Sequence, residues 1–166
     1  RIFFFFFCLL LLVISLVKAE SGLPPEVEPR YVRAIIAFNS NKLDEALGIL
    51  EEVLTKAPQA YSALEMKALI IKAQGKSQQA IDIYAKLSKI APRARKPQYY
   101  FEIGNILYKQ KRFAASRPYL NAAIRADFNV GASHFFLGLM DYEDKQWYGA
   151  ATHFRETIAS NADDLK

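Results

Sequence analysis

The sequence predicts an all-α solenoid, a stack of antiparallel helix pairs, on the strength of three observations. Four short segments recur along the chain at offsets of 34, 36 and 34 residues. Each segment joins two stretches whose apolar residues follow the spacing of an amphipathic helix. A small residue precedes each segment, and a large apolar residue follows it, at fixed distances. A helix pair of this kind buries its apolar faces by stacking on its neighbours, so four copies predict one stack.

The repeated elements are defined by residue class rather than by exact identity. The recurring segments are Asn41–Ala46, Gly75–Ala80, Lys111–Ser116 and Lys145–Ala150. The small residues seven positions before them are Ala34, Ala68, Gly104 and Gly138, and the large residues four positions after them are Leu50, Tyr84, Leu120 and Phe154. We expect the small residues to let two helices approach closely and the large ones to fill the space beside them. Pro58 and Pro92 close the first two units, because proline cannot extend a helix.

This pattern resembles the tetratricopeptide repeat family over residues 27–164. The resemblance implies a right-handed superhelix of four repeats at 27–60, 61–94, 97–130 and 131–164, with a linker at 20–26 and the start of a truncated continuation at 165–166. First helices are expected at 28–39, 61–74, 97–110 and 131–144, and second helices at 43–56, 77–90, 113–126 and 147–160. The chain departs from the family pattern at Phe128 and Ala162, which replace the closing proline, and at Ala37 and Asp141, where an aromatic is usual.

Residues 1–19 predict a targeting segment. The run from Ile2 to Val17 is apolar apart from Ser15, and it is shorter than the roughly 20 residues that span a bilayer. Its length suits the apolar region of a signal peptide, and Ala19 suits cleavage before Glu20. We therefore expect export to the periplasm or cell envelope, with a membrane anchor at residues 2–17 as the alternative. Cys8 is the one cysteine, so the chain forms no internal disulfide and no cysteine-based zinc site.

Charge is distributed unevenly along the part that follows the targeting segment. Residues 20–66 carry 4 basic and 8 acidic side chains, residues 67–125 carry 13 and 2, and residues 126–166 carry 3 and 7. The basic block falls in turns within units and in the loop between units, which are opposite edges of a solenoid, so a solvated surface is the simpler interpretation. The sharper interpretation is an acidic partner or an anionic membrane surface. Nucleic acid is disfavoured because a secretory segment removes the chain from the cytosol.

The resemblance implies that the first helices line a concave groove that binds a peptide. The expected groove residues are Tyr31, Phe38, Asn39, Glu65, Leu69, Lys72, Phe101, Asn105, Tyr108, Lys109, Phe135, Leu139, Tyr142 and Glu143. Tyr100, Ile103, Leu107, His134 and Leu137 are assigned to the core, so a second aromatic stripe exceeds what packing needs and indicates an interface. The competing interpretation places these aromatics in the core. The family's carboxylate clamp is absent, because its places hold Tyr31, Ile35, Met66, Gln98 and Glu102.

The sequence predicts no enzyme, no cofactor and no metal site. His134 and His153 lie in one unit and are expected to approach each other near Asp141 or Glu156, but no catalytic motif accompanies them. The predicted function is an exported scaffold that binds a protein or peptide segment. The alternatives are a periplasmic module of a larger outer-membrane assembly, secretion or polysaccharide-export protein, or a regulatory domain of an envelope enzyme.

The ends of the chain predict a fragment. Residue 1 is not Met, and the last predicted helix carries Ala150, Ala151, Phe154 and Ile158 on one face. Part of that apolar face packs within its own unit, and the rest is expected to pack against a helix that follows. We therefore expect self-association through this last helix, and membrane contact only through the N-terminal segment.

Overall fold

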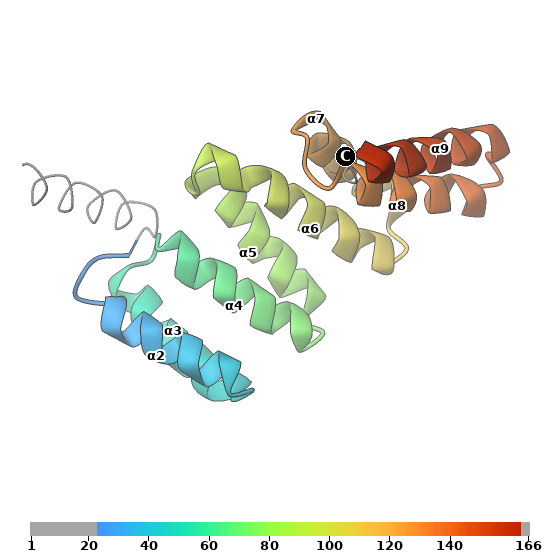
Figure 1. The fold of residues 1–166 in the computed structure, drawn as a ribbon. Helices are drawn as coiled ribbons and strands as arrows, with labels where there is room; N and C mark the ends of the chain where they lie inside the picture. Colours follow the sequence, from blue (N-terminus) through green and yellow to red (C-terminus); the bar gives the residue numbers. More distant parts are fainter. Residues whose placement is uncertain (1–22, 164–166) are drawn as a thin grey trace, which may run out of the picture. The chain divides into compact units, whose positions relative to one another are not determined.

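Figure 1 shows the computed structural model, which describes residues 23–163. Those residues form eight α-helices and one short 3-10 helix, with no strand among them. The helices are α2 (Glu28–Asn39), α3 (Leu43–Lys56), α4 (Tyr61–Ala73), α5 (Ser77–Ile90), η1 (Arg93–Arg95), α6 (Lys96–Lys109), α7 (Phe113–Arg125), α8 (Val130–Glu143) and α9 (Trp147–Asp163). All bounds lie within one residue of the predicted ones, except that α9 ends three residues later. The predicted all-α fold class is confirmed.

The targeting segment, Cys8, the start of the linker and residues 165–166 lie outside the described residues. The chain divides into two compact units, residues 1–76 and 77–166. Helices α2, α3 and α4 belong to the first unit, and α5 to α9 belong to the second. The predicted bounds of the four repeats stay a prediction. No helix within residues 23–163 combines the length and apolar character needed to cross a membrane.

Each recurring segment begins with a left-handed residue that ends a first helix. Asn41, Gly75, Lys111 and Lys145 have φ values of 59°, 76°, 57° and 60°. In the first turn, the N–H of Asn41 donates to the carbonyl of Phe38, and the N–H of Lys42 donates to that of Ala37. The same pair of bonds recurs at the other three turns, and this is the Schellman motif that satisfies the last carbonyls of a helix.

The first unit is built on the close contact of α2 with α3. Ala34, Ala46 and Leu50 are fully buried in one core cluster, as is Val53. The Oη of Tyr31 on α2 donates to the carbonyl of Ser62 on α4 at 3.2 Å. The repeated small and large residues of this unit therefore lie in its core, as the sequence predicts.

In the second unit the fit between small and large residues is visible atom by atom. A Cβ added at Gly104 on α6 would lie 2.8 Å from the side chain of Leu120 on α7. A Cβ added at Gly138 on α8 would lie 2.7 Å from the ring of Phe154 on α9. The hydroxyl of Ser116, which replaces the usual alanine, donates to the carbonyl of Gly104 at 2.7 Å. The predicted small-to-large contacts are confirmed in both helix pairs.

The structure differs from the predicted core by one residue on α6. Tyr99, not Tyr100, is fully buried at the start of α6, where its ring stacks on Tyr84 of α5 with 6.2 Å between centroids. Tyr100 is only half-buried. Adjacent residues point about 100° apart around a helix, so which of the two tyrosines is buried depends on which neighbouring helix covers that side of α6.

Pro118 lies inside α7 without ending it. Proline lacks the N–H that would bond to the carbonyl four residues earlier, which here belongs to Ala114. Both residues are exposed, so water can reach that carbonyl, and the helix continues to Arg125.

We predict opposite effects of adding one methyl group at two helical glycines. Gly104→Ala is expected to lower the free energy of unfolding by about 1 kcal/mol or more, because overpacking against the fully buried Leu120 outweighs the gain in helix propensity. Gly48→Ala is expected to raise it by about 0.5–1 kcal/mol, because its Cβ would meet nothing within 4 Å. Urea denaturation followed by circular dichroism measures both changes, and equal shifts in one direction would contradict the packing account.

Candidate functional site

The predicted groove residues of the first unit differ in exposure. Tyr31 and Phe38 on α2 are half-buried and pack against the core cluster. Asn39 is exposed at the end of the same helix, and Glu65 and Lys72 on α4 are half-buried. Leu69 on α4 is 40% exposed. In this unit the larger predicted aromatics therefore contribute mainly to packing.

Phe101 and Tyr108 on α6 also take part in the core of the second unit. Both pack against the buried cluster of Leu120, Leu137 and Met140. The ring of Phe101 lies 6.2 Å from those of Phe128 and Phe136, and the ring of Tyr108 lies 4.9 Å from that of Phe136. Packing thus accounts for these two rings, contrary to the argument that a second aromatic stripe exceeds what the core needs. Their contact with a partner stays a prediction.

Phe135 and Tyr142 on α8 are the predicted groove aromatics that lie open to solvent. Their exposed fractions are 44% and 58%, and a spacing of seven residues places them on one face of the helix. Tyr142 also contacts Trp147 at the start of α9, with ring centroids 5.3 Å apart in an edge-on arrangement. Trp147 is 58% exposed, and the sequence analysis did not assign it to a site. Leu139, between the two aromatics on α8, is half-buried.

Polar groove residues of α6 and α8 approach each other at one end of these helices. Burial raises the pKa of the Tyr108 hydroxyl, and the charge of Glu143 on α8 raises it further. Lys109 and Glu143 are both exposed. Among the described residues, the buried Oδ1 of Asn105 has no hydrogen-bond partner. The end of this surface therefore offers side chains of both charges beside the exposed aromatics.

The basic block of the second unit is divided between the two ends of α6. Arg93 and Arg95 lie exposed in η1, just before α6, whereas Lys111 and Arg112 lie exposed just after it. A helix of 14 residues is about 20 Å long. These charges therefore lie too far apart to form one patch, as the sequence analysis expected.

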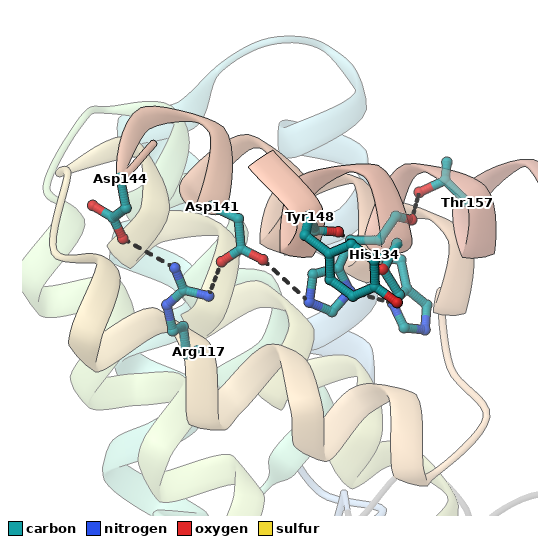
Figure 2. A network of polar contacts seen from close by, with 8 residues as sticks. Arg117, His134, Asp141, Asp144, Tyr148 and Thr157 are labelled. Atoms are coloured by element: carbon teal, nitrogen blue, oxygen red, sulfur yellow. Dashed lines mark hydrogen bonds and ion pairs between the residues drawn. The ribbon is translucent and has the colours of Figure 1, made fainter. Parts of the chain in front are cut away.

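A network of ionic contacts joins α7, α8 and α9 (Figure 2). Arg117 on α7 donates from Nη1 to Oδ1 of Asp141 on α8 at 2.6 Å and from Nη2 to Oδ2 of Asp144 at 3.1 Å. The side chain of Asp141 is only 6% exposed. A Cβ added at Gly149 on α9 would lie 2.6 Å from Oδ2 of Asp141. A glycine at this position on α9 thus leaves room for a buried carboxylate.

The network continues into a pair of histidines between α8 and α9. Oδ2 of Asp141 lies 3.7 Å from Nε2 of His153, and Nδ1 of His153 lies 3.0 Å from Nδ1 of His134. Partial burial lowers the pKa of the His134 imidazole and the charge of His153 lowers it further, while Glu156 acts in the opposite direction. The predicted approach of the two histidines near Asp141 is confirmed, although His134, assigned to the core, is only half-buried.

Sequence reasoning missed Arg117 as the partner of Asp141. The available signal was an acidic residue where the repeat pattern places an aromatic, together with Gly149 eight residues later. Within residues 23–163, no group of three or more His, Cys, Asp and Glu side chains is arranged to hold a metal ion. The expectation of a non-enzymatic chain stays a prediction.

Comparison with known proteins agrees with the repeats found in the sequence. A family model described as "Tetratricopeptide repeat" matches residues 31–95, 73–130 and 101–164. No curated protein sequence matches the chain significantly.

Solved structures with similar folds include the MamA RS-1 ArsTM double mutant, at 19% identity and a TM-score of 0.73 over 89% of this chain and 80% of that one. MamA from Desulfovibrio magneticus RS-1 is 18% identical, with a TM-score of 0.72 over 82% and 76% of the two chains. YrrB, described as a TPR protein with an unusual peptide-binding site, is 16% identical, with a TM-score of 0.67 over 88% and 73%. At these identities the likeness concerns the fold alone.

We predict that the Arg117–Asp141 pair matters far more to stability than an exposed ion pair. Arg117→Met is expected to lower the free energy of unfolding by about 3 kcal/mol, because it leaves the Asp141 carboxylate buried without its closest cation. The double variant R117M/D141N is expected to be less destabilised than R117M, because no buried charge remains.

The matched control is Lys42→Met, which breaks the exposed Lys42–Glu45 pair at 3.3 Å and is expected to change stability by less than about 0.5 kcal/mol. Urea denaturation measures all three variants. A change in R117M as small as that in K42M would show that Asp141 does not need its partner.

Proposed function

This chain belongs to the tetratricopeptide repeat family, and from that premise we propose that it binds a segment of a partner protein along α6 and α8, the first helices of its second unit. The observation that carries the proposal is the pair of exposed aromatics on α8. Phe135 and Tyr142 lie on one helix face and are 44% and 58% exposed. Aromatic side chains bury a large area at low cost in conformational entropy, and they anchor many protein interfaces.

The neighbouring polar groups support a peptide as the kind of partner. Lys109 and Glu143 are exposed at the same end of α6 and α8, where they can pair with charged side chains or with main-chain groups of a bound segment. YrrB, a protein of similar fold, is described as having an unusual peptide-binding site, and this is in keeping with the proposal. An acidic partner is the finer form of the proposal. Its support is the overall charge of residues 67–125, which carry 13 basic and 2 acidic side chains, rather than any single basic patch.

We also propose that the chain acts outside the cytosol, in the periplasm or cell envelope. The support is the 16-residue run from Ile2 to Val17, apolar apart from Ser15, followed by Lys18 and by Ala19, a small residue suited to cleavage before Glu20. A scaffold in that compartment would meet exported partners.

We predict that the exposed aromatics of α8 bind peptides. The chain would be used to select from a phage-displayed library of random 12-residue peptides, and the affinities of selected peptides measured by fluorescence anisotropy. The double variant Phe135→Ser/Tyr142→Ser is expected to weaken binding at least about tenfold, the loss of about 1.4 kcal/mol. It is also expected to lower the melting temperature, because the ring of Phe135 lies 6.0 Å from that of Phe136 and 6.1 Å from that of Phe154, so binding is compared at a temperature at which both chains show the same helical circular dichroism.

Ile158→Ser is the matched control, because Ile158 is 71% exposed on α9 and lies outside the proposed surface. It is expected to leave peptide binding unchanged. If the selected peptides bind the double variant as tightly as the original chain, the proposed surface is wrong.

A separate prediction concerns export. In a bacterial host, residues 1–26 fused to alkaline phosphatase are expected to give an active periplasmic enzyme whose mature product begins at Glu20. N-terminal sequencing reads the start directly. A fusion that stays cytosolic and inactive would refute export, and an uncleaved, membrane-bound product would favour the anchor over the signal peptide.

A further inference from the structure

The two histidines of the chain meet each other across the last helix pair. The full sequence has two histidine residues, His134 on α8 and His153 on α9, and their Nδ1 atoms lie 3.0 Å apart. At that distance one nitrogen carries the hydrogen and the other offers its lone pair. Two N–H groups cannot face each other there, because both would be donors.

The tautomers follow from the groups around the pair. Nε2 of His153 faces the carboxylate Oδ2 of Asp141 at 3.7 Å, so a hydrogen on that nitrogen is favoured. The Nδ1 of a neutral His153 then bears the lone pair, and the hydrogen bond runs from Nδ1–H of His134 to Nδ1 of His153. In this state both imidazoles are neutral and the contact between α8 and α9 is satisfied.

A first added proton leaves this hydrogen bond in place. The extra proton can sit on either ring, because a singly protonated pair still has one donor and one acceptor at the shared Nδ1 contact. A second proton removes the last lone pair, so two cationic rings with facing N–H groups stand 3.0 Å apart. That arrangement is repulsive in charge and in hydrogen bonding.

The surrounding charges do not offer enough compensation for two protons. Helix α7 contributes Arg117, a cation that already occupies Oδ1 of Asp141 at 2.6 Å. Helix α8 contributes Asp141, and α9 contributes Glu156, whose charge favours protonation of His134 but is outweighed by burial and by His153. Asp144 is engaged with Arg117 at 3.1 Å. Among the side chains that the structure describes, Oδ2 of Asp141 is the one carboxylate oxygen within ion-pair distance of either imidazole.

We propose that the His134–His153 pair is a proton-operated latch between α8 and α9. The latch holds while the pair carries at most one proton, and the second proton separates the rings and loosens the last helix pair. Besides the contact of His153 with Asp141, these helices are joined by contacts that do not titrate. The contact of Gly138 with Phe154 is one of them, and the hydroxyl of Thr157, shared between the carbonyl of His153 at 3.0 Å and that of Gly131 at 3.3 Å, is another.

The direction of the pH effect follows from the proton balance. The pKa of His134 in the folded chain lies below its ordinary value of 6.5, so the unfolded chain binds more protons in this range. Stability is therefore complete above about pH 6.5 and falls as the pH drops below that value. For one extra proton, the unfolding equilibrium constant rises at most about tenfold per pH unit.

The test compares the full chain with two variants from pH 7.5 to pH 5.0, in the presence of EDTA so that bound metal does not contribute. Urea midpoints of the original chain are expected to fall with pH. The double variant His134→Gln/His153→Gln is expected to lose this histidine-linked slope, whatever its absolute stability. Phe154→Leu is expected to be less stable at every pH while keeping the slope, because it weakens the contact of Phe154 with Gly138, which does not titrate.

Two further measurements locate the effect. Because the chain has only two imidazoles, NMR titration can follow each of them, and the single variants H134Q and H153Q assign the signals. The two titration curves are expected to separate, with one midpoint below pH 6.5. Amide hydrogen exchange, corrected for its intrinsic pH dependence, is expected to accelerate at pH 5.5 in α8 and α9 but not in α2 and α3. The proposal is overturned if both imidazoles titrate together near 6.5, if the double variant keeps the full slope, or if all helices respond alike.

Discussion

The close approach of two helices within a pair is the constraint on which the rest of the structure depends. It requires a residue without a bulky side chain on the first helix wherever the second helix presents a large one. Gly104 faces Leu120, and Gly138 faces Phe154, at distances that leave no space for a Cβ without displacement. Because an interior packed to this density has few voids, these contacts set the separation of the helices, and the remaining side chains must fit the space that is left.

The turns reinforce the same geometry from the backbone. Four first helices end in a Schellman motif with a left-handed residue at C′, and only one of the four is glycine. Asn is tolerated there, but Lys111 and Lys145 pay a conformational cost of roughly 1 kcal/mol each. The helices on either side therefore stabilise the turn enough to outweigh that cost, which shows how strongly packing and turn depend on each other.

Helix α8 exposes aromatic side chains on one face and buries a charged side chain on the other. Its outer face carries Phe135 and Tyr142, which leave aromatic area exposed to solvent. Its inner face carries Asp141, a buried carboxylate held by Arg117 of α7 and facing His153 of α9. Burying a charge is costly unless it is paired, so α8 has ionic contacts at this position, where the other first helices bury the apolar residues Ala37, Ile71 and Leu107. The contact of α8 with α9 therefore depends on the protonation of the two histidines, and the orientation of the exposed face of α8 depends on that contact.

The repeat, the helix bounds and the small-to-large contacts were determined by the sequence itself, because they depend on local periodicity and on residues at fixed spacing. The sequence did not determine which tyrosine is buried at the start of α6, because Tyr99 and Tyr100 are adjacent and face different sides of the helix. The sequence also did not determine which aromatics of the predicted groove are buried. Phe101 and Tyr108 pack against Phe136, whereas Phe135 and Tyr142 stay exposed. Only the tertiary structure decided this, because burial depends on which neighbouring helix covers each face. The pairing of Arg117 with Asp141, 24 residues away, likewise follows from the packing of α7 on α8, which no local pattern records.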